Sequence, residues 1–272
     1  LLFVYAPVTH WVWGGGIMTS WGVMDFAGDI VVHTTAGPAA LVCAVMVGKR
    51  RHFPQSQIPP HSPALTMIGA SMLWVGWFGF NGGSALGAGG GAGMALLVTH
   101  IAAATASLVW MGIEWMRFGL PSLVGIVTGM VAGLATVTPA SGFIGVPGGL
   151  ILGLAGGFGC YIAVDIIRGK LKIDDSLDVF AVHGVGGIIG SLLVAFLALP
   201  SFGGLCLADG VTAGSQFMVQ LASVAITVPW TLVVSVIILM IAKAVAGLRV
   251  DDQTEVDGLD LAEHGERGYP GN

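Results

Sequence analysis

The feature that most limits how this chain can fold is the length of its segments without Asp, Glu, Lys or Arg. Such segments cover residues 30–48, 52–113, 118–164, 179–208 and 210–242. A spanning helix needs about 20 apolar residues, and a soluble domain needs a charged surface. With 10 basic and 15 acidic side chains in 272 residues, the chain lacks such a surface. The sequence indicates an integral membrane protein and excludes a soluble enzyme, a disordered chain and a nucleic-acid-binding protein.

Two of these runs are long enough for two spans each, and both have a weak centre. The first is broken by glycines at residues 87–93, and the second by prolines and glycines at 139–149, which is turn chemistry. Helices are favoured over a barrel because the runs are continuous rather than alternating. We predict an all-α polytopic membrane protein with seven helices near 26–47, 64–86, 93–113, 121–138, 148–167, 178–199 and 216–245.

The basic residues predict how these helices are oriented. All ten Lys and Arg fall on one side of the seven-helix arrangement, and the opposite loops carry only Asp209. Because cytoplasmic loops are enriched in basic residues, we expect the chain to begin outside and to end in the cytoplasm. Residues 1–245 then form the membrane domain, and 246–272 form an acidic tail. Such a tail is either simply solvated or a docking segment for a soluble partner or a neighbouring subunit.

Two histidines inside the predicted spans share a pattern. His33 and His183 both stand in V-H-x-x-x-G, each after an Asp near a helix start, Asp25 and Asp178. The two helices run in opposite directions, as an inverted repeat produces, so the imidazoles are expected to meet within the membrane. A buried packing role is the alternative, and we favour it for the lone His100.

The chemistry of a histidine pair favours binding or proton relay over metal binding. Two histidines without a third ligand underfill a zinc shell, so we predict no metal and no cofactor. A neutral imidazole pair instead donates to and accepts from a small polar solute, or relays a proton.

Aromatic residues gather where the first two predicted helices reach the outer side. Trp13 lies just before the first helix, and Trp77, Phe80 and Ser84 lie at the end of the second. Such residues belong to an interfacial belt in many membrane proteins, but a Trp face with a hydroxyl also selects a small cation.

These residues carry a resemblance to the ammonium transporter family, Amt/Mep with the Rh proteins as relatives, and most of all to its bacterial members. The resemblance is collinear over essentially the whole chain, and its clearest stretches are 13–16, 25–33, 48–50, 76–81, 121–122, 138–140, 174–187 and 247–265.

The resemblance implies an eleven-helix fold with an inverted five-plus-five repeat, of which this chain supplies helices five to eleven. We therefore expect about four helices upstream, no transport by these 272 residues alone, and a histidine pair on an exposed face. It also implies a homotrimer in the cell (inner or plasma) membrane, bound at the cytoplasmic face by a PII-type signal protein in many bacteria.

The resemblance also assigns roles to residues of this chain. His33 and His183 are the twin histidines of a narrow apolar pore, Trp13 and Ser84 belong to the outer cation site, and Phe80 is half of the gate. Asp25, Asp178 and Trp77 are supporting residues. Asp29 departs from the family pattern, where glycine is usual.

The function implied is transport: ammonium is recruited outside, loses its proton and passes the histidines as ammonia, with or without a relayed proton. An ammonium sensor of the same fold is the first alternative. A membrane metalloenzyme using the histidine pair is a weaker one, so we predict that the protein is not an enzyme.

Overall fold

The structure, a computed structural model, describes residues 1–55 and 60–268. The segment between the first two predicted helices, 26–47 and 64–86, and the tail at 246–272 therefore extend partly outside the described residues. Within those residues the secondary structure is entirely helical, without strands. The predicted fold class, an all-α membrane protein, is confirmed.

Fifteen helical elements are present in the described residues. Three are π-helical turns, η1 to η3, and η4 is a short 3₁₀ helix. In chain order the elements are α1 (Tyr5–Trp13), α2 (Ile17–Ser20), η1 (Asp29–His33), α3 (Thr34–Val47), α4 (Pro63–Gly83), α5 (Gly90–Phe118), α6 (Leu123–Val137), α7 (Val146–Val164), η2 (Asp165–Lys170), η3 (Phe180–Gly184), α8 (Val185–Leu197), η4 (Pro200–Phe202), α9 (Ala213–Ala246), α10 (Asp252–Asp257) and α11 (Leu259–His264).

Each of the seven predicted ranges holds one long helix. Six helices are long and apolar enough to cross a membrane, counting the π-turns continuous with α3, α7 and α8. The seventh, α6, is apolar but has only 15 residues.

The helix starts follow from local sequence. Ser62, Ser122 and Thr212 cap α4, α6 and α9 by accepting a backbone N–H of the first turn, which satisfies a donor that has no partner inside the helix. The prediction did not include α1, α2, η4 or the two short tail helices.

Small residues allow the helices at the centre to pack closely. On α6, a Cβ at Gly133 would lie 2.3 Å from the carbonyl oxygen of Ala102 on α5, so only glycine fits there. Gly153 of α7 faces the same Ala102. Close backbone approach of this kind is typical of helices that associate in lipid.

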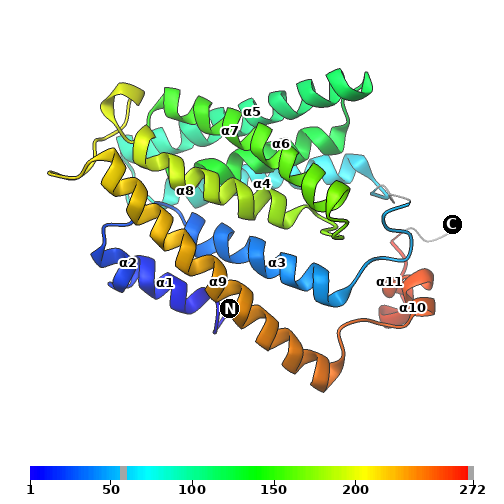
Figure 1. The fold of residues 1–272 in the computed structure, drawn as a ribbon. Helices are drawn as coiled ribbons and strands as arrows, with labels where there is room; N and C mark the ends of the chain where they lie inside the picture. The colour runs from blue at the N-terminus through cyan, green and yellow to red at the C-terminus, as the bar shows by residue number, and fades with distance from the viewer. Residues whose placement is uncertain (56–59, 269–272) are drawn as a thin grey trace.

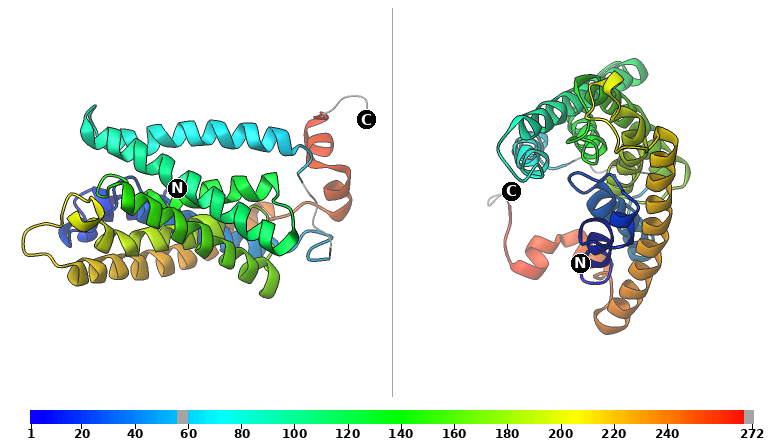
Figure 2. Two further views of the ribbon diagram at one scale, coloured as in Figure 1. Left: turned by 90° about the horizontal axis from the view of Figure 1, so that it is seen from above. Right: turned by 90° about the vertical axis from the view of Figure 1, so that its left-hand side faces the viewer.

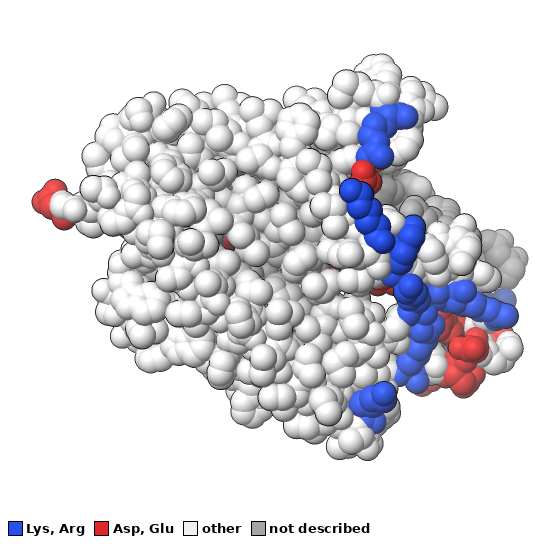
Figure 3. All heavy atoms as spheres, in the orientation of Figure 1, with Lys and Arg blue, Asp and Glu red and all other residues white. Residues whose placement is uncertain are grey.

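The long helices run side by side, with α3 next to α8 and α9, and the tail helices α10 and α11 lie beyond one end (Figures 1 and 2). The charged side chains are also unevenly distributed along the length of the helices. Figure 3 shows the Lys and Arg side chains gathered at the end where α10 and α11 lie, while the long flank is almost free of charge.

Candidate functional site

The two histidines of the repeated pattern both lie in π-helical turns. His33 ends η1, which leads into α3, and His183 lies in η3, which leads into α8. A single π-helical turn inside a helix is rare and is frequent at functional sites. The sequence pattern predicted two related helices but gave no sign of the π-turns.

The structure brings the two imidazoles together. Nδ1 of His33 and Nδ1 of His183 are 3.1 Å apart, and the ring centroids are 5.0 Å apart. His33 is only 3% exposed and His183 is partly buried. The expectation that the pair lies on an exposed face is therefore wrong for His33, because the neighbouring rings and helices cover it.

The glycine of each histidine pattern lets the other π-turn approach. A Cβ at Gly37 would lie 2.3 Å from the Cα of Gly184 in η3. A Cβ at Gly187 would lie 3.1 Å from the Cβ of His33 in η1. The spacing V-H-x-x-x-G thus has a physical basis. Gly37 packs against the turn that holds His183, and Gly187 packs against the turn that holds His33. We refer to this contact as the glycine crossing.

The histidines open onto an apolar groove of about 420 Å³. Besides the two imidazoles, its lining consists of apolar or aromatic residues: Val32, Ala36, Leu73, Gly76, Trp77, Phe80 and Val179. The ring of Trp77 stacks on His33, with centroids 5.3 Å apart and an interplanar angle of 18°. Phe80 meets His33 edge-on at 6.1 Å. In this groove, the histidines offer the polar side chains.

A buried hydrogen-bond chain fixes Trp77. Its Nε1 donates to Oγ1 of Thr138 at 2.9 Å, and Thr138 lies 3.4 Å from Oδ1 of Asn81. Asn81 donates in turn to Thr99 at 2.9 Å. All four residues are buried, so the chain holds the indole plane against His33. Sequence reasoning did not assign this role to Thr99, Asn81 or Thr138.

At the other end of η1, Asp25 stabilises the helix start. Its carboxylate accepts the backbone N–H groups of Gly28, Asp29 and Val31. Burial raises the pKa of Asp25 to about 6, against the lowering effect of these donors. Trp13 donates from Nε1 to the backbone oxygen of Asp25 at 2.8 Å.

Ser84 lies at the end of α4 and donates to the backbone oxygen of Phe80 at 2.8 Å. Trp13 is 44% exposed. Within the described residues no hydrogen bond joins Trp13 to Ser84; Trp13 is bonded to the backbone before η1 and Ser84 to the backbone of α4.

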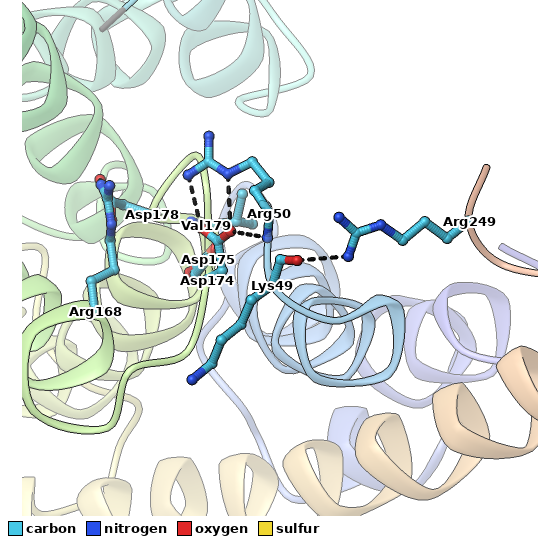
Figure 4. A network of polar contacts seen from close by, with 8 residues as sticks. All are labelled: Lys49, Arg50, Arg168, Asp174, Asp175, Asp178, Val179 and Arg249. Carbon is cyan, nitrogen blue, oxygen red and sulfur yellow. Dashed lines mark hydrogen bonds and ion pairs between the residues drawn. The ribbon is translucent and has the colours of Figure 1, made fainter. Parts of the chain in front are cut away.

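The start of η3 is held by acidic residues (Figure 4). Asp175 caps this turn by accepting the backbone N–H groups of Val179 and Phe180. Asp178 adopts a positive φ of 55° and pairs with Arg168 at 3.1 Å. Burial raises the pKa of Asp178 to about 6, although Arg168 opposes the shift.

Asp174 connects this segment to the end of α3. Arg50 donates to it from the backbone N, Nε and Nη2 at 2.8–2.9 Å. Burial alone would raise the pKa of Asp174, but these bonds and the guanidinium charge hold it below its usual value. Arg249 of the tail donates to the backbone oxygen of Lys49 (Figure 4). It also pairs with Glu255. The tail is therefore attached just after the end of α3.

The described residues contain no group of three or more His, Cys, Asp or Glu side chains placed to hold a metal ion. None of the free cysteines Cys43, Cys160 and Cys206 lines the groove at the histidine pair.

Comparison with known proteins gives a consistent result. The Ammonium Transporter Family matches residues 1–269. The chain is 49% identical over 271 residues to ammonium transporter Amt1 of Archaeoglobus fulgidus, covering 99% of this chain and 68% of the relative. It is 43% identical to an ammonium transporter of Aquifex aeolicus, covering 98% of this chain and 62% of the relative.

Two solved structures share the fold. One is described as a sensor Amt protein, with a TM-score of 0.88, 34% identity, and coverage of 95% of this chain and 66% of that one. The other is Mep2 of Saccharomyces cerevisiae, with a TM-score of 0.82, 35% identity, and coverage of 92% and 58%. This chain thus spans about three fifths to two thirds of the length of the proteins it matches.

Proposed function

This chain belongs to the ammonium transporter family, a family of non-enzymatic membrane proteins, and on that premise we propose that the protein moves ammonium across a membrane past His33 and His183. The observation that carries the proposal is the imidazole pair, 3.1 Å apart, on an apolar groove with Trp77 and Phe80. A small polar solute in this groove meets the hydrogen-bonding atoms of the two histidines among apolar neighbours.

The histidine pair suits ammonia better than ammonium. An ion in an apolar groove loses its hydration at high cost, whereas a neutral molecule does not. If the Nδ1–H of one imidazole donates a hydrogen bond to Nδ1 of the other, the first ring keeps a free acceptor at Nε2. The second ring then keeps a free N–H donor at Nε2. Nε2 of His33 has no hydrogen-bond partner among the described residues. The pair therefore presents one acceptor and one donor to ammonia, with or without relay of a proton.

In the proposed cycle, ammonium is first recruited outside by Trp13 and Ser84. The indole face attracts a cation and the hydroxyl accepts a hydrogen bond. Phe80 acts as a gate because its ring lies at the edge of His33. Three residues act as supporting residues. Asp25 holds the backbone of η1, and Trp77 stacks on His33. Asp178 pairs with Arg168 just before η3.

The end that carries the basic side chains is the proposed cytoplasmic side, in a cell (inner or plasma) membrane. The proposed assembly is a homotrimer with one pore in each subunit. The acidic tail and the basic inner loops form the proposed face for a PII-type signal protein.

Ammonium sensing is the second candidate, favoured by the match to a protein described as a sensor Amt protein at a TM-score of 0.88. The two are separated by methylammonium uptake in a host that lacks its own ammonium transporters, with the full-length protein. Uptake above the empty host supports transport. Ammonium binding to the purified protein without uptake by cells would favour sensing and contradict transport.

A further inference from the structure

Asp29 is a buried acid to which the proposed transport cycle assigns no role. It is the first residue of η1 and is 0% exposed. Its Oδ2 is hydrogen-bonded to the hydroxyl of Ser191 on α8, and its Oδ1 has no partner among the described residues. Asp25, four residues earlier, differs because its carboxylate accepts three backbone N–H groups.

The free oxygen of Asp29 lies at the glycine crossing. A Cβ built on Gly187 would meet Oδ1 of Asp29 at 2.1 Å and the Cβ of His33 at 3.1 Å. Oδ1 and His33 therefore face the same small surface at the start of α8, one turn after His183. The bond to Ser191 joins the two histidine-bearing helices beside the histidines.

Among the described residues, the groups around Asp29 supply no positive partner for a carboxylate. The elements packed on η1 are α1, α3, α6, α8 and α9. The acidic neighbour is Asp25, and the nearest imidazoles are His33 on the same turn and His183 across the crossing. The other titratable or charged side chains on these elements are Tyr5, His10, Cys43 and Lys243, with Lys243 in the last turn of α9.

An ionised carboxylate in this position would bury a charge with one hydroxyl partner. That arrangement is costly in apolar surroundings, because a single hydroxyl replaces only a small part of the lost hydration. In the neutral acid, the O–H on Oδ2 donates to Oγ of Ser191, and the unpartnered atom is a carbonyl oxygen rather than a charged one. The partners present thus fit the neutral form.

We propose that Asp29 holds a proton during the working cycle, and that this neutral carboxyl group closes the glycine crossing by its bond to Ser191. Loss of the proton places an unpaired charge between η1 and α8 and separates His33 from His183. Asp29 is then a positioning residue for the histidine pair. Its effect on ammonium conduction rests on the proposed function, whereas its protonation does not.

Infrared spectroscopy of the purified full chain in lipid tests the protonation directly. A protonated, buried carboxyl group gives a C=O stretch above the amide I band. At about pH 8, Asp25 is ionised because its pKa is near 6. We expect one such band in the wild-type protein, its loss in Asp29→Asn and its retention in Asp25→Asn. Absence of the band, or its persistence in Asp29→Asn, overturns the proposal.

Ser191→Ala provides a second readout that does not depend on how well Asp29→Asn folds. Removing the hydroxyl frees the O–H of Asp29, so the carboxyl band should move to higher frequency without disappearing. An unchanged band position would show that Ser191 is not the partner and would contradict the proposed closure.

The pH dependence of methylammonium uptake tests the coupling to the histidines. Asn at position 29 keeps a side-chain hydrogen bond to Ser191 but cannot ionise. We expect Asp29→Asn to match the wild type within about twofold near neutral pH and to exceed it progressively at alkaline pH, where the wild type loses its proton. A constant ratio across the pH range overturns the coupling. If the wild type shows no uptake, the proposed function fails while the infrared result still decides the protonation.

Discussion

His33 and His183 are separated by 150 residues in the sequence, yet their Nδ1 atoms lie 3.1 Å apart. The contact depends on backbone approach at the glycine crossing, where Gly37 lies against Gly184 and Gly187 lies against η1. The geometry of the histidine pair therefore depends on these glycines as much as on the imidazoles.

The glycine crossing predicts a strong effect of a single methyl group. In Gly37→Ala the new Cβ meets the backbone of Gly184, which cannot move as a flexible side chain would. Overpacking of this kind costs about 1–3 kcal/mol, so the thermal midpoint should fall and uptake should decrease sharply. The matched control is Gly69→Ala on α4, where a Cβ has nothing within 4 Å. Equal midpoints for the two variants would disprove the role of the crossing.

The hydrogen-bond chain behind Trp77 predicts a different kind of defect. Thr138→Val preserves shape but leaves the buried indole N–H of Trp77 without the hydroxyl oxygen that accepts it. A buried unsatisfied donor costs about 1–3 kcal/mol, and the ring becomes free to tilt away from His33. We expect a lower thermal midpoint and altered Trp fluorescence. Thr128→Val in α6, whose hydroxyl donates to the backbone oxygen of Val124, should leave the emission unchanged.

Much of the fold was predictable from the sequence because lipid imposes simple rules. Charge-free runs, broken by glycine and proline, indicate where the seven long helices lie. Lys and Arg, which the sequence predicts on one side, gather at one end of the molecule (Figure 3). α6 is shorter than its predicted 18-residue span, with 15 residues, because it begins after the Ser122 cap and ends before Thr138.

The candidate site was less accessible to sequence reasoning. The repeated V-H-x-x-x-G pattern paired the histidines, but π-turns leave no known signature in a single sequence, so their presence at η1 and η3 was missed. Asp178 was named because it stands near the start of a predicted helix. The structure gives the capping role to Asp175, while Asp178 has a positive φ and pairs with Arg168. The partners of Trp77 come from α4, α5 and the end of α6, which only the tertiary fold brings together.

The ion pair between Arg50 and Asp174 predicts a pH-dependent contribution to stability. In Arg50→Ala, the buried carboxylate of Asp174 loses two charged donors, which should lower the free energy of unfolding by about 1–3 kcal/mol near neutral pH. Because Arg50 holds the pKa of Asp174 below its usual value, the contribution is present above about pH 4 and is lost as the pH falls further.

Thermal midpoints of wild type and Arg50→Ala, measured across this range, check that prediction. The difference should shrink in acid, and Lys49→Ala should leave the midpoint unchanged, since Lys49 takes part through its backbone oxygen. A difference that grows on acidification would contradict the ion-pair account.

The proposed orientation predicts which cysteines react from outside. Cys206 is exposed, follows η4 at the end opposite the basic side chains and should react with an impermeant maleimide in intact cells. In a background without Cys206, a probe at Gly90→Cys should also react, because a side chain there meets no neighbour. A probe at Gln55→Cys should react only after permeabilisation. The reverse pattern would invert the orientation.

The central claim is that ammonium-derived substrate passes the histidine pair, and His183→Ala tests it most directly. The variant removes the ring that contacts His33 at Nδ1 but leaves Gly184 and Gly187 of the crossing in place. Methylammonium uptake should be measured with the full-length protein in cells without ammonium transporters, alongside assembly by size-exclusion chromatography. The account predicts normal assembly with uptake abolished or strongly altered in rate or selectivity. Uptake with unchanged rate and selectivity in His183→Ala would contradict it.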